Sequence, residues 1–168
     1  MLTSQFLGPY VAANIVGLML IVVAILWPKI ARISFIVMFC AAAVVNAVLG
    51  VNDPGLYVTG YGELALFPIY RDFIRGFFSE HATAVIIAIA CCQICIALLL
   101  TRSGWLFLMG VIGGGLFFLA ITPLGAGSAL PAPLLYGVGL FVLHRRLLRD
   151  TPHPAGNNGR GGVPHHRH

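Results

Sequence analysis

The amino-acid sequence predicts an all-α integral membrane protein, a bundle of five transmembrane helices with one amphipathic helix at the membrane interface. Three observations support this fold class. First, 59% of the 168 residues are hydrophobic and only 9% are charged, whereas about 25% of the residues of a soluble domain are charged. Second, several apolar stretches approach the roughly 20 residues that cross a bilayer core. Third, the basic residues gather in alternate gaps between these stretches, as the positive-inside rule predicts.

The gaps between the apolar stretches differ in the sign of their charges. The first gap, the third gap and the chain after the last stretch hold Lys29, Arg32, Arg102, Arg145, Arg146 and Arg149. The long second gap holds Asp53, Glu63, Asp72 and Glu80, with Arg71 and Arg75 as its only basic residues. This pattern predicts that the N-terminus and the second gap lie outside and that the C-terminus is cytoplasmic. The net charge of +5 is therefore attributed to orientation and lipid headgroups, and no nucleic-acid partner is expected.

The predicted spans follow one another with short connections. They lie at about 9–27, 33–51, 82–101, 105–122 and 130–148. Pro28 and Lys29 end the first span, and the turn Asn52-Asp53-Pro54-Gly55 ends the second. Since no basic residue precedes the first stretch, we expect a retained span and not a secretory signal peptide, which needs a basic n-region.

The fifth stretch is the least regular, because its apolar part ends near Leu143 and its first turn contains Pro131 and Pro133. Prolines are tolerated in a first helical turn. The stretch reaches spanning length if it continues to Leu148, because arginines near a helix end can snorkel to the interface. A re-entrant segment, and thus a bundle of four spans, is the alternative. Residues 1–150 are expected to form the membrane domain, and 151–168 a disordered cytoplasmic tail.

The outer segment 52–81 contains the predicted interfacial helix. Apolar side chains recur there at i, i+3, i+4, i+7 and i+8, which indicates one continuous helical stripe. The stripe consists of Tyr70, Phe73, Ile74, Phe77 and Phe78. One interpretation is a packing lid over the bundle. The other is a roof over a lateral pocket for a lipid-like ligand, with polar contacts at its rim. The candidate ligand or partner contacts are Asn46, Tyr57, Tyr61, Glu63, Arg71, Asp72 and Arg75.

The interiors of the spans contain no Asp, Glu, Lys or Arg before the end of the fifth stretch, which argues against ion or proton transport. Asn14, Asn46 and Gln93 place one amide in each of the first three spans. Such amides hydrogen-bond across helices, with about 0.6 to 2 kcal/mol each; a substrate site is the alternative. Gly110 and Gly114 form a G-x-x-x-G pattern that predicts close helix packing, within the chain or between copies.

Cys92 and Cys95 form a C-x-x-C pattern in the third span, beside Cys91 and with Cys40 in the second. A redox disulfide needs an exposed thiol with a lowered pKa. We expect these thiols to be buried in apolar surroundings and inert, so that their role is structural. No metal site, cofactor or catalytic residue is identified in the predicted bundle, which favours a non-enzymatic role.

The segment Phe35–Gly50, with its ending Asn46-Ala47-Val48-Leu49-Gly50, precedes the Asn52-Asp53-Pro54-Gly55 turn, the aromatic outer loop and the Leu124-Gly125-Ala126-Gly127 break. In this plan the chain resembles the DoxX-like family of small bacterial integral membrane proteins over about 30–145. Members are generally four-helix bundles, so the resemblance implies that the first span is an additional element or that the helix count is shifted. The resemblance implies a bacterial inner (plasma) membrane location and an accessory role in redox complexes, with some relatives linked to quinone or thiosulfate oxidation.

The leading hypothesis is therefore a DoxX-like, non-catalytic accessory or structural subunit of a membrane-associated redox complex. Its expected partners are the lipid bilayer, other membrane redox proteins and further copies of the chain. The first alternative is a quinone-coupled thiol oxidoreductase that resembles the vitamin K epoxide reductase bundle and uses Cys92 and Cys95. The second is a carrier or binder of a small neutral or lipid-like molecule, which requires a polar cavity at mid-depth.

Overall fold

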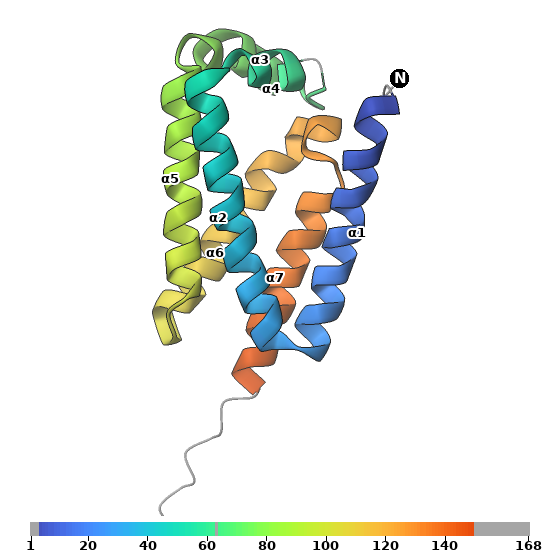
Figure 1. Ribbon diagram of the computed structural model, residues 1–168, viewed down its shortest axis with the longest axis vertical. Coiled ribbons are helices and arrows are strands. Elements are labelled where there is room, and N and C mark those ends of the chain that lie inside the picture. Colours follow the sequence, from blue (N-terminus) through green and yellow to red (C-terminus); the bar gives the residue numbers. More distant parts are fainter. Residues whose placement is uncertain (1–3, 63, 150–168) are drawn as a thin grey trace, which may run out of the picture.

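Five long helices stand side by side, and a short helical cap lies across one end of them (Figure 1). The computed structural model describes residues 4–62 and 64–149, so the predicted tail lies outside the described residues. The long helices are α1 (Ser4–Leu26), α2 (Pro28–Asn52), α5 (Ala82–Leu100), α6 (Gly104–Ile121) and α7 (Ala132–Arg149). The cap consists of α3 (Gly55–Gly62), α4 (Pro68–Phe73) and the π-helical turn η1 (Ile74–Phe78), and the 3-10 segment η2 (Thr122–Ser128) joins α6 to α7.

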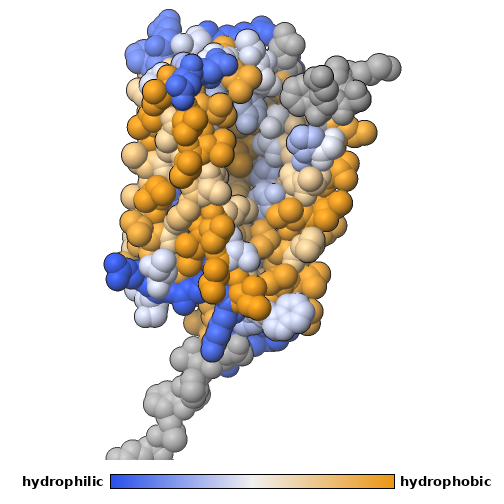
Figure 2. All heavy atoms as spheres, viewed as in Figure 1, coloured by the Kyte–Doolittle hydropathy of each residue, from blue (hydrophilic) through white to orange (hydrophobic). Residues whose placement is uncertain are grey.

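Four helical stretches have the length and composition to cross a membrane. These are Leu7–Leu26, Pro28–Asn52, Ala82–Leu100 and Gly104–Ser128. Apolar side chains cover much of the bundle surface between its two polar ends (Figure 2); Val37 and Leu116, for example, are 59% and 61% exposed. A continuous apolar surface of this kind is typical of contact with lipid tails and is rare in soluble proteins.

The helices form two close pairs, α2 with α5 and α1 with α7, and α6 contacts both pairs. In each pair, a glycine residue allows the two helices to come into close contact. A Cβ atom built at Gly50 would lie 2.8 Å from Ile86 of α5, and one at Gly17 would lie 2.8 Å from Leu135 of α7. The predicted packing residue Gly110 lies against α5, where its Cβ would be 3.0 Å from the backbone nitrogen of Leu100.

The second glycine of the G-x-x-x-G pattern lies where α6 meets two other helices. A Cβ built at Gly114 would lie 2.7 Å from Leu140 Cδ1 of α7 and 3.2 Å from Phe39 Cζ of α2. Phe39 is 1% exposed and Leu140 is fully buried. Both glycines therefore pack helices within this chain.

Polar side chains connect α1 and α2 to the rest of the bundle, α1 toward the cap and α2 at the opposite end. At the cap end, Asn14 Nδ2 donates to the carbonyl of Ala129, 3.0 Å away, so the amide predicted as an interhelical contact bonds to the connection before α7. At the opposite end, Arg32 Nε donates to the carbonyl of Leu100 at 2.6 Å, and its guanidinium lies 4.8 Å from the centre of the Phe107 ring.

The charges divide between the two ends of the bundle. The start of α2, the connection between α5 and α6, and the end of α7 lie opposite to the cap (Figure 1). These helix ends carry Lys29, Arg32, Arg102, Arg145, Arg146 and Arg149. The cap end carries the described acidic residues Asp53, Asp72 and Glu80, together with Arg71 and Arg75. The three-dimensional arrangement thus brings the basic residues from separate gaps together at one end.

The cap departs from the predicted interfacial helix. A continuous stripe needs an unbroken helix, but the backbone at Gly76 is not helical (φ −94°, ψ −109°). Ile74 and Phe78 are buried at 3% and 7% exposure, whereas Phe73 and Phe77 are exposed. The prediction of one regular helix with all five apolar residues on one face is therefore wrong: only part of the stripe packs on the bundle.

Candidate functional site

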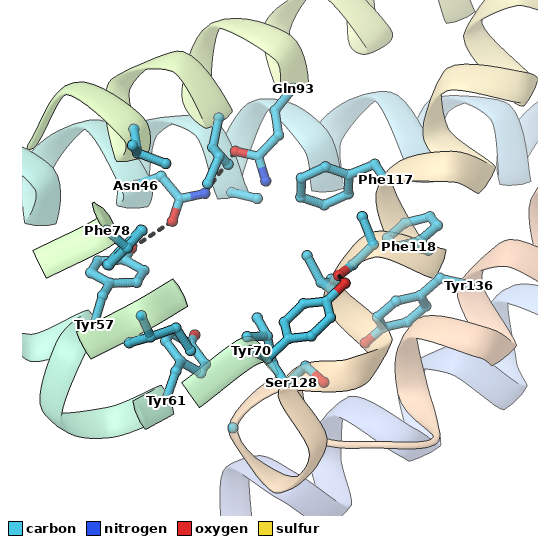
Figure 3. Close-up of a pocket in the computed structure, with 18 of the residues that line it drawn as sticks. Asn46, Tyr57, Tyr61, Tyr70, Phe78, Gln93, Phe117, Phe118, Ser128 and Tyr136 are labelled. Carbon is cyan, nitrogen blue, oxygen red and sulfur yellow. Dashed lines mark hydrogen bonds between the residues drawn. The ribbon is translucent and has the colours of Figure 1, made fainter. Parts of the chain in front are cut away.

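A cavity of about 550 Å³ lies between the cap and the bundle (Figure 3). Every described helical segment except α1 contributes lining residues, and nine of the 21 residues are aromatic. The aromatic ones are Phe39, Tyr57, Tyr61, Tyr70, Phe73, Phe78, Phe117, Phe118 and Tyr136. Its volume and its largely apolar wall with a few polar groups are typical of a small-molecule site.

The bundle side of the cavity is a group of packed aromatic rings from three helices. The Phe39 ring of α2 lies 5.9 Å and 5.3 Å, between centroids, from Phe117 and Phe118 of α6. The Tyr136 ring of α7 lies 5.4 Å from that of Phe118, and its hydroxyl donates to the carbonyl of Ala13 at 2.9 Å. Edge-to-face and offset arrangements of this kind are favourable, and they hold the rings in fixed positions.

The cap side of the cavity is held down by close contact with η2. The Tyr61 ring, 5.6 Å from that of Tyr57, packs so closely on Gly127 that a Cβ there would lie 2.3 Å from Tyr61 Cδ1. The backbone N–H of Leu66 also donates to the carbonyl of Pro123 at 2.9 Å. These contacts fix the distance between the roof and the bundle.

The two tyrosines of α3, Tyr57 and Tyr61, remain protonated at neutral pH. Burial raises the pKa of Tyr61 above its ordinary value of 10.0. Burial and, to a lesser extent, the neighbouring Tyr61 raise the pKa of Tyr57. Desolvation disfavours the charged phenolate. The Tyr57 hydroxyl is therefore available as a hydrogen-bond donor.

A chain of three polar side chains from three helices crosses the wall of the cavity (Figure 3). The Tyr57 hydroxyl of α3 donates to Asn46 Oδ1 of α2 at 2.5 Å. Asn46 Nδ2 in turn donates to Gln93 Oε1 of α5 at 2.8 Å. Such a network orients each amide, because every donor has a defined acceptor.

Gln93 is 3% exposed, but its amide nitrogen has no hydrogen-bond partner among the described residues, and the amide faces the cavity beside Phe117 (Figure 3). The buried side-chain atoms that lack a hydrogen-bond partner among the described residues are Asn14 Oδ1 and His144 Nδ1; the Gln93 amide nitrogen is not one of them, in agreement with its access to the cavity. The arrangement therefore combines a largely apolar cavity with an amide donor of Gln93 that faces it.

The structure brings together residues to which the sequence analysis gave different roles. The cavity is lined by the predicted contacts Asn46, Tyr57 and Tyr61, by the interhelical amide Gln93, and by four members of the predicted apolar stripe, Tyr70, Phe73, Ile74 and Phe78. The charged candidates Arg71, Asp72 and Arg75 are exposed and lie outside its lining, and Glu63 lies outside the described residues. Asn14 belongs to the contact between α1 and the start of α7.

Several lining residues were missed from the sequence. Phe39, Phe117 and Phe118 lie in apolar stretches, where aromatic residues are ordinarily assigned to packing. Tyr136 carried the only usable signal, because a buried tyrosine hydroxyl within a span needs a partner and marks a polar position.

The cysteines differ from the expectation of buried thiols. Cys91, Cys92 and Cys95 are exposed free thiols on α5, and Cys40 is half-buried. None of them lines the cavity that Gln93 faces; Cys91 and Cys95 border a separate shallow apolar groove between α2 and α5. The expectation of burial was wrong because α5 turns its glutamine inward and its cysteines toward the apolar outer surface.

We expect the double variant Cys92→Ala and Cys95→Ala to fold, with a stability change within about 0.5 kcal/mol, because exposed side chains contribute little packing. Thermal unfolding in mild detergent measures the change. A much larger loss of stability would contradict the exposed position of these two thiols on α5.

The described residues contain no group of three or more His, Cys, Asp or Glu side chains that could hold a metal ion. The lining residues of the cavity likewise include no carboxylate, imidazole, amine, guanidinium or thiol. Comparison of the chain with protein-family models, with curated proteins and with solved structures gives no match.

Proposed function

We propose that this protein spans a bacterial inner membrane five times, is related to the DoxX-like family that its sequence resembles, and binds a small, neutral, lipid-soluble molecule in the cavity beneath the cap. The observation that carries the binding function is the cavity itself, about 550 Å³ with a largely apolar wall rich in aromatic rings and with the Tyr57–Asn46–Gln93 network in it. A solid apolar core around these amides would have argued against it.

The placement of the charges supports the proposed topology. Basic residues gather at the end opposite to the cap, and the positive-inside rule assigns such an end to the cytoplasm. The cap and its cavity then lie in the outer leaflet. As a fifth span, α7 is supported by its packing along α1 and α6 and by full burial of Leu140 and Leu143; its terminal arginines reach the interface.

The space between the two helix pairs supports a route by which a ligand reaches the cavity from the membrane. Figure 2 shows a hollow on the bundle surface between α2 and α1, with less hydrophobic residues at its base. No described residue of α1 lines the cavity, whereas Tyr136 of α7 does. A lipid-soluble guest can therefore enter sideways from the outer leaflet without crossing the polar cap.

The chemistry of the lining supports binding and not catalysis. Among its described residues, only tyrosines are titratable, and protonated buried phenols are poor bases at neutral pH. A binding subunit is compatible with the accessory role in a redox complex that the resemblance implies. The exposed cysteines of α5 give the thiol oxidoreductase alternative no connection to the cavity.

Co-purification tests the proposal directly. The full chain and two variants are purified in mild detergent, and their bound small molecules are extracted and measured by mass spectrometry. Ala42→Phe places a ring where Ala42 lines the cavity, and Ala41→Phe places the same ring at the adjacent exposed position. We expect a specific lipid-soluble compound with wild type and Ala41→Phe, and at least a tenfold loss with Ala42→Phe. Equal recovery from both variants would exclude the cavity as the binding site.

A further inference from the structure

We propose that Gln93 recognises the ligand through its amide N–H groups, so that the guest carries a hydrogen-bond acceptor of the carbonyl type attached to a flat apolar ring. This inference rests on the proposed function, because it names the chemical class of molecule that the cavity takes. It also assigns ligand recognition to a residue that packing alone would leave as an interhelical contact.

The direction of the hydrogen bonds decides which atoms of Gln93 are available. The Tyr57 hydroxyl donates to Asn46 Oδ1 at 2.5 Å, which turns the Asn46 amide so that its nitrogen donates to Gln93 Oε1 at 2.8 Å. One of the two lone pairs of the Gln93 carbonyl oxygen is thereby used, whereas the amide nitrogen donates to no described residue. The network begins at the Tyr57 hydroxyl, which donates to Asn46, and ends at the NH2 group of Gln93. The group that the network presents to the cavity is therefore a hydrogen-bond donor.

The surroundings of Gln93 define the rest of the guest. Its amide faces the cavity next to the Phe117 ring, with Phe118 and Tyr136 beyond it (Figure 3), and Gln93 itself is 3% exposed. Aromatic walls favour a flat ring in offset or edge contact. The described lining has no charged side chain, so a charged guest would lose its hydration without compensation. A neutral ring with one acceptor group satisfies both the wall and the donor.

Three diphenyl probes of nearly equal shape test this assignment. They are 4-decylbenzophenone, 4-decyldiphenylmethane and 4-decyldiphenylamine, whose bridging groups are an acceptor, an apolar group and a donor. Binding of each is measured by native mass spectrometry on the full chain in nanodiscs. We expect the ketone to bind at least tenfold more tightly than the methylene and amine probes.

Variants at two adjacent positions of α5 test whether the preference for the ketone probe depends on Gln93. Gln93→Met keeps the side-chain length and removes the donor, whereas Ile94→Met changes an exposed neighbour. The ketone preference is expected to fall to about twofold or less in Gln93→Met and to stay in Ile94→Met. Should Gln93→Met fail to fold, infrared spectra of a ¹³C-labelled ketone on wild-type protein give the same answer, because a hydrogen-bonded carbonyl absorbs at lower wavenumber than the free probe in nanodiscs.

Each of the other outcomes contradicts the inference, and each does so for a different reason. Equal binding of ketone and methylene probes would remove the donor role of Gln93 and leave the proposed binding function in place. Tighter binding of the amine would show that the amide presents its carbonyl. If none of the probes binds, the ligand class is wrong, and the Ala42→Phe comparison decides separately whether the cavity binds any molecule.

Discussion

Replacement of Phe39 by alanine is expected to destabilise the bundle by about 3 kcal/mol. Truncation of a buried phenylalanine costs about 3–5 kcal/mol in soluble proteins, through lost apolar transfer and the cavity left behind. In a membrane the transfer contribution is smaller, because lipid tails are as apolar as the protein interior, so the lower end of this range applies. Phe39 is 1% exposed and contacts the rings of Phe117 and Phe118.

The control for this prediction is Phe141→Ala on α7. Phe141 is 60% exposed, so the same chemical change leaves no internal cavity, and its effect should stay within about 0.5 kcal/mol. Thermal or denaturant-induced unfolding in a single mild detergent measures both variants. If the two variants lose equal stability, the aromatic group that includes Phe39 does not support the helix packing described here.

The helical class and the approximate positions of the long helices could be predicted from the sequence, because length and hydropathy are sufficient to recognise membrane-spanning stretches. The start of α2 could not be predicted from the sequence. Pro28 was read as the end of a span, whereas it occupies the first turn of α2, where a proline loses no backbone hydrogen bond. Trp27 alone consequently separates α1 from α2.

The cap shows where periodicity fails. The spacing of five apolar residues correctly places helical structure after Pro68, but it assumes a constant rotation of 100° per residue along the segment. The non-helical backbone at Gly76 changes that rotation midway. Ile74 and Phe78 are then buried and Phe77 is exposed, an outcome that depends on tertiary contacts and not on the local pattern.

The candidate site could be predicted only in pieces. Asn46 and Gln93 were each recognised as polar residues within spans, and Tyr57 and Tyr61 as polar contacts at a rim. Their meeting depends on the rotation of α2 and α5 about their axes and on the position of α3, which one sequence does not determine. The exposed charges of the cap drew attention in the sequence, whereas the cavity is built from uncharged residues, many of them aromatic.

Replacement of Gly127 by valine is expected to detach the cap and abolish ligand binding. A Cβ at this position would lie 2.3 Å from Tyr61 Cδ1, so the aromatic ring has to move. Overpacking of this kind costs about 1–3 kcal/mol, and the strain falls on the contact that fixes the roof of the cavity. Hydrogen exchange measured by mass spectrometry should rise several-fold in α3, while α5 stays protected.

Two companion variants separate this effect from a general loss of stability. Gly137→Val changes a glycine of α7 around which a Cβ meets nothing within 4 Å, and it should leave exchange in α3 unchanged. Tyr61→Ala combined with Gly127→Val removes the collision and should restore protection of the cap, so the two substitutions are non-additive. Ligand binding should return only in part, because the ring of Tyr61 also forms the wall. Full protection of α3 in Gly127→Val alone would mean that the cap does not depend on the Tyr61–Gly127 contact, and the cavity roof would then need another support.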